Sequence, residues 1–288
     1  MKKCLTLLGL FYFSLTFGQF TKSNIELSSD FVESILIDKR GGEWIGTDEG
    51  LNLITHNDNN SFFSNISNEN GLLNSEVFNL EEVDNGFIAA FSNDGISFFN
   101  PKTFNFKRLK LKSKPISIYK NFLGNNYWVT TSNSGIYIIN KDFDIEMNLV
   151  YDPINPITLS HSKFDSNNHN SLIDLKDESY AYIATPNGFN VYNRAQSTIR
   201  RHFTKRASSL LSNKINSIYR FSQTELFVLT DNGINIFNTK SNKFIDKTIS
   251  KGKKIDRLFK IGNNEYAYIF KGKLYTFITD NLNSELAV

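Results

Sequence analysis

Histidine and carboxylate side chains are the groups in this chain best suited to hold a metal ion or to move a proton. The four histidines are His56, His161, His169 and His202. His161 and His169 lie eight residues apart, whereas a helical metal-binding pair lies four apart. We therefore predict no metal site, and no motif for a cofactor is present.

Glu81 and Glu82 are adjacent carboxylates, which would suit general acid–base catalysis only if both faced the same site. The surrounding sequence predicts a β-strand, in which adjacent side chains point to opposite faces. A joint role is therefore not expected. The chain has no phosphate-binding loop and no Gly-x-Ser-x-Gly motif, and its one cysteine, Cys4, lies near the N-terminus. We predict a protein that is not an enzyme.

A glycine motif that recurs six times predicts the elements that hold these side chains. Its best copy covers residues 43–53. The glycines at its turn, where we expect a backbone angle that a side chain would oppose, are Gly50, Gly95, Gly135, Gly188, Gly233 and Gly272. The intervals between them are 45, 40, 53, 45 and 39 residues. This period predicts an all-β β-propeller of four-stranded antiparallel blades. Six repeats are recognisable, so the ring has six blades or is an incomplete ring of seven.

The second repeat shows the expected blade most fully. Strands are predicted over residues 75–83, 87–91, 96–100 and 104–111, and Asp84-Asn85-Gly86 is predicted to form a hairpin turn. Residues 87–91 are a continuous apolar run, which is typical of a strand buried on both faces. Residues 19–27 are a candidate for closing the ring by pairing with strands near the C-terminus.

Two features of the repeats bear on recognition. Trp44 and Trp128 could stack on a sugar, but they occupy equivalent strand positions in two repeats, which favours packing between neighbouring blades. The longest interval contains an insertion over residues 142–170, with Pro153, Pro156 and a polar stretch. Loops of this kind often carry recognition in propellers, and a disordered connector is the alternative.

The N-terminus reads as a secretory signal peptide over residues 1–18. Lys2 and Lys3 precede an apolar run that is too short to span a bilayer, and Gln19 is the expected first mature residue. Without the two lysines the formal charge of the 288-residue chain falls from +3 to +1, which gives no electrostatic basis for binding nucleic acid. We predict one β-propeller domain over residues 19–288, in the periplasm or outside the cell, with no later transmembrane segment.

The repeats resemble those of the two-component regulator propeller family, which forms the periplasmic sensor half of bacterial hybrid two-component systems. The family pattern Asp-x-x-Gly-x-x-Trp-Ile-Gly-Thr-x-x-Gly-Leu-x matches residues 38–52, with Gly42 one position late. The segments leading into blades also match, at residues 70–77 (Asn-Gly-Leu-Leu-Asn-Ser-Glu-Val), 151–160 (Tyr-Asp-Pro-Ile-Asn-Pro-Ile-Thr-Leu-Ser) and 211–218. The resemblance extends over residues 28–277.

This resemblance implies a sensor that binds an oligosaccharide or another small extracellular ligand and takes part in signal transduction. Family members commonly have seven blades, and no stalk, kinase or DNA-binding segment is recognised after the repeats here. The expectation is therefore a ligand-sensing propeller without output domains. A propeller that binds a protein partner in envelope assembly or secretion is the alternative, and a propeller lyase or glycosidase is a third class. The sequence does not identify the ligand-binding residues.

Overall fold

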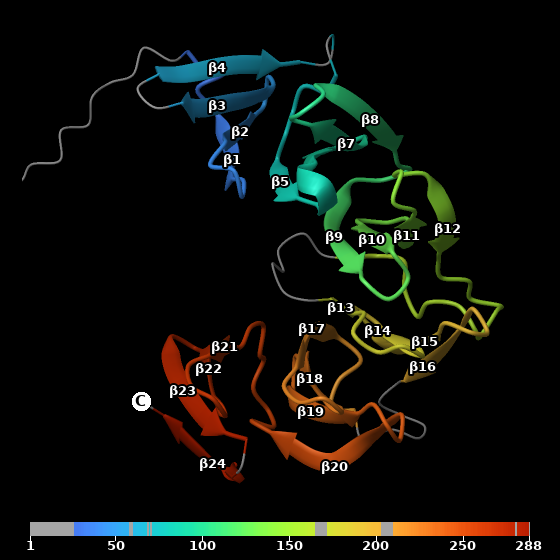
Figure 1. Ribbon diagram of the computed structural model, residues 1–288. Helices are drawn as coiled ribbons and strands as arrows, with labels where there is room; N and C mark the ends of the chain where they lie inside the picture. The colour runs from blue at the N-terminus through green and yellow to red at the C-terminus, as the bar shows by residue number, and fades with distance from the viewer. Residues whose placement is uncertain are drawn as a thin grey trace, which may run out of the picture.

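The computed structural model describes residues 26–57, 60–67, 69, 71–164, 172–202, 210–279 and 281–287. The predicted signal peptide lies outside these residues. Six four-stranded antiparallel sheets follow one another along the chain, each built from four consecutive strands, which confirms the β-propeller (Figure 1). In the described part of the chain, no helix has the length and hydrophobicity needed to cross a membrane.

The first three blades end before the long insertion. Blade 1 contains β1 (Val32–Ile37), β2 (Glu43–Thr47), β3 (Leu51–Asn57) and β4 (Asn60–Ile66). Blade 2 contains β5 (Asn79–Glu82), β6 (Ile88–Ser92), β7 (Gly95–Asn100) and β8 (Asn105–Lys110), with the 3₁₀ turn η1 (Asp84–Gly86) between its first two strands. Blade 3 contains β9 (Pro115–Asn121), β10 (Asn126–Thr131), β11 (Ile136–Ile139) and β12 (Ile145–Leu149).

The other three blades repeat the same order. Blade 4 contains β13 (Ile173–Asp174), β14 (Tyr180–Thr185), β15 (Gly188–Asn193) and β16 (Thr198–His202). Blade 5 contains β17 (Ile215–Arg220), β18 (Glu225–Thr230), β19 (Gly233–Asn238) and β20 (Lys243–Ile249). Blade 6 contains β21 (Phe259–Lys260), β22 (Glu265–Phe270), β23 (Lys273–Ile278) and β24 (Asn281–Ala287).

The strand prediction for blade 2 was accurate except at its start. The first strand begins at Asn79 rather than at Ser75, because Val77 donates its backbone N–H to Thr47 in blade 1 instead of pairing within its own sheet. The second strand, β6, is buried throughout, as its apolar sequence predicted. The blade-to-blade hydrogen bond at Val77 shows how the segment leading into a blade also joins two sheets.

The turn glycines provide backbone conformations that other residues rarely adopt. All six have positive φ angles, which confirms the prediction from the repeat. At Gly95, with φ +148°, a Cβ atom would lie 2.0 Å from the carbonyl oxygen of Leu109. At Gly135 it would lie equally close to the carbonyl oxygen of Leu149. Glycine is therefore required by space as well as by backbone angle at these two turns.

Apolar side chains hold each blade against the next one. Trp44 of blade 1 meets the ring of Phe99 in blade 2 edge-on, with 5.3 Å between ring centroids. Trp128 of blade 3 makes the same kind of contact with Tyr192 of blade 4 at 5.4 Å. Both indole side chains are almost fully buried. The predicted role of the two tryptophans in packing between blades is confirmed.

The six blades form an arc that is open between blade 6 and blade 1 (Figure 1). The buried apolar clusters join blades 1 and 2, blades 2 and 3, blades 3 to 5, and blades 5 and 6, and within the described residues none joins blade 6 to blade 1. The first strands of the blades lie nearest the centre of the arc. Blade 6 obtains its fourth strand from β24, and most of the candidate closing segment, residues 19–27, lies outside the described residues.

Candidate functional site

A pocket of about 630 Å³ opens where the innermost strands of blades 3, 4 and 5 end. Its walls are formed by β9, β13 and β17 and by the turns that follow β9 and β13. Most of its surface is apolar, contributed by Ile118, Phe122, Leu123, Leu175, Ile218 and Tyr219. Pockets that hold small molecules commonly have this size and an apolar lining with a few polar groups.

The blades carry different side chains at equivalent positions of the inner wall. In blade 3, Tyr119 lies opposite Trp128 in the antiparallel pairing. In blade 4, Asp174 lies opposite Tyr182, which is the position equivalent to Trp128. Asp174 therefore takes the place of Tyr119, and a carboxylate replaces a ring at the wall of the pocket.

Asp174 forms a buried ion pair with Arg220 of blade 5. The Nη2 atom of Arg220 lies 2.7 Å from Oδ1 of Asp174, and Nε lies 3.0 Å from Oδ2. The two side chains are only 8% and 11% exposed. Burial works to lower the pKa of Arg220, but the hydrogen bonds and the charge of Asp174 outweigh it and raise that pKa. The pair links two blades at the pocket, and removing either partner would leave an uncompensated buried charge.

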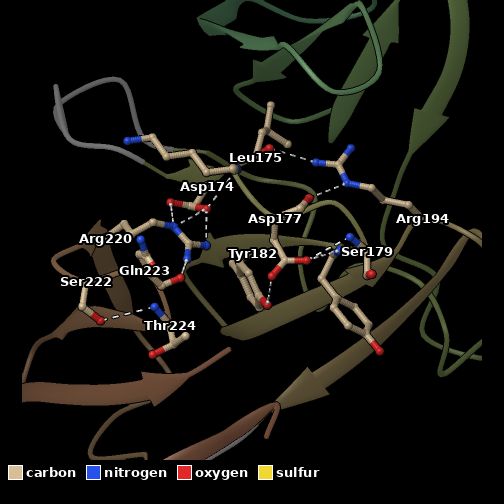
Figure 2. Close-up of polar contacts among 12 residues, drawn as sticks. Asp174, Leu175, Asp177, Ser179, Tyr182, Arg194, Arg220, Ser222, Gln223 and Thr224 are labelled. Carbon is tan, nitrogen blue, oxygen red and sulfur yellow. Dashed lines mark hydrogen bonds and ion pairs between the residues drawn. The ribbon is translucent and has the colours of Figure 1, made fainter. Parts of the chain in front are cut away.

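The turn after Asp174 is fixed by its own hydrogen bonds (Figure 2). The Asp177 carboxylate accepts a bond from the backbone N–H of Ser179 at 2.9 Å and one from the Tyr182 hydroxyl at 3.4 Å. Arg194 donates to the carbonyl oxygens of Asp177 and Leu175, each at 3.1 Å. The side chains of Asp177, Tyr182 and Arg194, which come from different parts of blade 4, therefore hold this wall of the pocket in place.

Blade 1 uses the same arrangement, and it explains the motif in the sequence. The carboxylate of Asp38 accepts bonds from the backbone N–H of Arg40 and Gly42 and from the indole N–H of Trp44 at 2.9 Å. Burial works to raise the pKa of Asp38, but these hydrogen bonds outweigh it and lower that pKa. The order of aspartate, glycine and tryptophan in this repeat thus closes a turn and anchors the indole.

Blade 3 contributes a cation and two exposed apolar side chains to the rim of the pocket. Lys120 bonds to the carboxylate of Asp84 in blade 2, and its ammonium group lies 4.2 Å from the ring centroid of Phe122. Phe122 is 77% exposed and Leu123 is 50% exposed. Large apolar side chains that project beside a pocket would lose solvent contact if a ligand bound there.

The carboxylate pair that the sequence singled out is separated as predicted. Glu82 accepts a bond from the backbone N–H of Lys39 in blade 1, whereas Glu81 accepts one from the backbone of Ile118 in blade 3. Burial raises the pKa of Glu81 to about 7. Burial likewise raises the pKa of Tyr119, next to Glu81, to about 12, and the Tyr119 hydroxyl accepts a bond from the backbone of Leu172.

The insertion differs from its predicted bounds. Residues 145–149 form β12, the regular fourth strand of blade 3, so the additional length begins after Leu149. The prediction over residues 142–170 was too long because β12 is a short strand whose first three residues are exposed, as in a loop. Arg201 on β16 donates to Thr158 O, Asp152 O and Asn155 O, and Leu159 is fully buried. A disordered connector is therefore the wrong interpretation for residues 150–164, and residues 165–171 lie outside the described part.

The histidines are not gathered around the pocket in the described structure. His161 is the one histidine whose side chain is described, and it lies on the insertion, where its ring is parallel to that of Tyr151. Its Nδ1 atom accepts a bond from the backbone N–H of Lys163 at 2.8 Å. Within the described ranges, no group of three histidine, cysteine or carboxylate side chains is placed to hold a metal ion.

The residues of the pocket were not predicted from the sequence. Lys120, Asp174 and Arg220 lie at or near the ends of the first strands of blades 3, 4 and 5, and Lys176 lies in the turn after β13. Aligning the repeats on their turn glycines would not have singled them out, because blade 2 has Glu81 at the position of Asp174 and Glu82 at the position of Arg220. The insertion is conspicuous in the sequence because it breaks the period of the repeat. The pocket, however, is formed by the first strands of blades 3, 4 and 5 and not by the insertion.

Three solved structures share the fold. The extracellular domain assigned to the hybrid two component system BT3049 from B. thetaiotaomicron is 17% identical, with a TM-score of 0.58 over 89% of this chain and 35% of that one. The corresponding domain of BT4673 is 15% identical, with a TM-score of 0.60 over 90% and 36%. Virginiamycin B lyase from Staphylococcus aureus is 15% identical, with a TM-score of 0.54 over 92% and 87%.

These similarities establish the fold and leave the activity open. The chain spans about a third of the length of the two extracellular domains. An extracellular domain of a hybrid two component system and a lyase share the architecture at similar identity, and a propeller fold does not by itself confer a function. No protein-family model matches the chain, and no curated protein matches it in sequence.

Proposed function

We propose that this protein is an extracytoplasmic ligand-binding propeller of the sensor kind, located in the periplasm or outside the cell. The observation that carries the proposal is the pocket at the ends of β9, β13 and β17, which combines a small-molecule volume with an apolar lining and fixed charges. The sensor-like repeat and the propeller fold support the same role. The ligand is an oligosaccharide or another small extracellular molecule.

The proposed role is binding without catalysis. A propeller lyase or glycosidase would need carboxylates and cations that converge on the central strands, and Glu81, Asp174 and Arg220 do lie on these strands. Asp174 and Arg220 neutralise each other through several hydrogen bonds, so neither is poised to exchange a proton. Glu81 is turned toward the backbone of Ile118. The charges on the inner wall therefore suit holding a ligand better than cleaving one.

A protein-interaction propeller is the second candidate, and the two ends of the arc favour it. Ile35 and Ile37 on β1 are 68% and 67% exposed. Ile269 and Leu274 in blade 6 are 58% and 43% exposed. The equivalent faces of the interior blades are buried against their neighbours. Apolar sheet faces of this kind often mark an interaction surface.

Calorimetric titration of the mature protein with a panel of neutral and acidic oligosaccharides tests the ligand-binding role. Saturable binding that Phe122→Ser weakens, while Ile154→Ser leaves it unchanged, is the expected result. Ile154 is the matched control because it is 90% exposed on the insertion, away from the pocket residues. Failure of the folded protein to bind any member of the panel would contradict the proposal, and binding lost only in Ile154→Ser would move the site to the insertion.

A further inference from the structure

Within the proposed ligand-binding role, on which this inference rests, we propose that the pocket takes a small ligand with a single carboxylate on a ring-shaped body. The charges of the lining residues indicate that the ligand carries a carboxylate. The apolar side chains around these charges indicate that the rest of the ligand is a ring. Neither feature was evident from the sequence, and both come from three consecutive blades that converge on one wall.

The charges that line the pocket leave one positive charge uncompensated. The three cations are Lys120, Lys176 and Arg220, and the carboxylate in the lining is Asp174. Asp174 is paired with Arg220, and Lys120 is paired with Asp84 just outside the pocket. Within the described structure, the ammonium group of Lys176 has no hydrogen-bond or ion-pair partner, and the residue is exposed. A ligand with one negative charge would balance this lysine.

Arg220 lines the same pocket as Lys176, and its guanidinium group is held in place by hydrogen bonds. Its Nε and Nη2 atoms are held by Asp174, and Nη1 donates to the carbonyl oxygen of Gln223 at 2.8 Å. A guanidinium group has five N–H donors, so donors remain for a ligand oxygen after these bonds are formed. The ion pair with Asp174 therefore fixes the plane of the guanidinium at the wall of the pocket.

The apolar surface next to these cations suits a ring. Phe122 is 77% exposed at the rim, and Tyr219 and Ile218 line the wall beside Arg220. Aromatic rings present flat apolar faces against which a planar or a pyranose ring can stack. The pocket volume of about 630 Å³ admits one or two rings with their carboxylate. A monocarboxylate with an aromatic or a sugar ring matches both the charge and the shape.

Calorimetric titration with two matched pairs of probes tests this class. The aromatic pair is 2-naphthoate and 2-naphthamide, and the sugar pair is methyl glucuronide and its amide. Each is titrated into the wild-type protein, Lys176→Glu and Lys240→Glu. Lys240 is the control because it is exposed at the β19–β20 turn, outside the pocket lining.

We expect at least one carboxylate to bind ten-fold or more tightly than its amide, with that preference lost in Lys176→Glu and kept in Lys240→Glu. The pair that binds identifies whether the ring is aromatic or a sugar. Equal affinity for acid and amide, equal losses in both lysine variants, or no binding of any probe overturns the inference. Binding of neutral oligosaccharides that depends on Phe122 but not on Lys176 would overturn this inference while upholding the proposed function.

Discussion

Individual residues in this protein carry two different kinds of constraint. The turn glycines are constrained by backbone conformation and by close contact, since at Gly95 and Gly135 the Cβ atom of any larger residue would meet a carbonyl oxygen of a neighbouring strand. Glu81 is constrained by burial, which favours its neutral form. The first constraint was predicted from the period of the sequence, whereas the second depends on a contact with blade 3 that no local pattern reveals.

Replacing Gly95 with alanine should destabilise the fold by about 3 kcal/mol or more, because the new methyl group combines an unfavourable φ with a severe contact. Gly252→Ala is the matched control, with φ +89° and no atom within 4 Å of the place that its methyl group would occupy. We expect it to cost about 1 kcal/mol. Urea unfolding measures the free energy of unfolding of both variants. Equal losses of stability would show that the contact with Leu109 does not contribute to the cost of Gly95→Ala.

Stability should depend on pH through Glu81 in a predictable direction. The folded protein holds the Glu81 proton more tightly than the unfolded chain does, because its pKa is raised from 4.5 to about 7. The associated stabilisation is complete below pH 4.5 and is lost as the pH rises to about 7. Glu81→Gln should therefore be more stable than the wild type at pH 8, by on the order of 2 kcal/mol, and similar to it at pH 4.

Unfolding free energies at several pH values measure this difference. Glu82→Gln is the control, because Glu82 lies on the opposite face of β5 and is ion-paired with Lys39 at 3.6 Å. A Glu81→Gln variant whose stability relative to the wild type does not change between pH 4 and pH 8 would contradict the burial of this carboxylate.

At the scale of elements, the turn between the first two strands of a blade is closed in different ways. Asp38 in blade 1 and Asp177 in blade 4 each bind turn N–H groups together with the aromatic side chain of the second strand. In blade 3 the indole N–H of Trp128 is buried with no partner among the described residues. The turns of blades 3 and 4 also form the rim of the pocket, so they combine structural and binding roles.

Substituting each tryptophan with phenylalanine should distinguish an indole N–H that is bonded to an aspartate, as in blade 1, from one that has no partner among the described residues, as in blade 3. Both indoles are buried to the same degree and pack edge-on against a ring of the next blade. Trp44→Phe leaves a buried oxygen of Asp38 without its bond, whereas Trp128→Phe removes an N–H that has no partner among the described residues. We expect Trp44→Phe to cost about 1–2 kcal/mol more than Trp128→Phe in chemical unfolding. The reverse order would disprove the role of Asp38 as an anchor.

At the scale of the whole molecule, the arc is open and its two end blades each expose an apolar face. Ile35 in blade 1 and Ile218 in blade 5 occupy equivalent positions on the first strand, opposite Ile45 and Val228. Ile35 is 68% exposed and Ile218 is 1% exposed. The difference arises because blade 1 has a neighbouring blade on one side only, whereas blade 5 lies between two.

Introducing a charge at these two positions tests whether the arc is open in solution. Ile35→Lys should change the thermal midpoint little, since surface substitutions usually cost within about 0.5 kcal/mol. Ile218→Lys should prevent folding or lower the midpoint severely, because it buries an unpaired charge. Equal damage from both substitutions would mean that blade 1 is covered in solution.

The sequence predicted the blade order, the turn glycines and the packing of the tryptophans, because each of these recurs with the period of the repeat. It did not predict the pocket, whose charged residues differ from blade to blade: Asp174 stands where blade 3 has Tyr119. The bounds of the insertion were also wrong, since β12 is short and mostly exposed although it pairs with β11. A segment that breaks the period can be recognised in the sequence. Which residues of different blades come together in space cannot be read from it.

The central claim is that a small ligand binds in the pocket between blades 3, 4 and 5. Isoleucine methyl NMR tests it directly, because Ile118, Ile173 and Ile218 line the pocket while Ile154 and Ile157 lie on the insertion. Titration with the oligosaccharide panel and the two ring carboxylates should shift the three pocket methyl signals and leave the two insertion signals unchanged. Shifts confined to Ile154 and Ile157, or no shift at any ligand concentration, would contradict it.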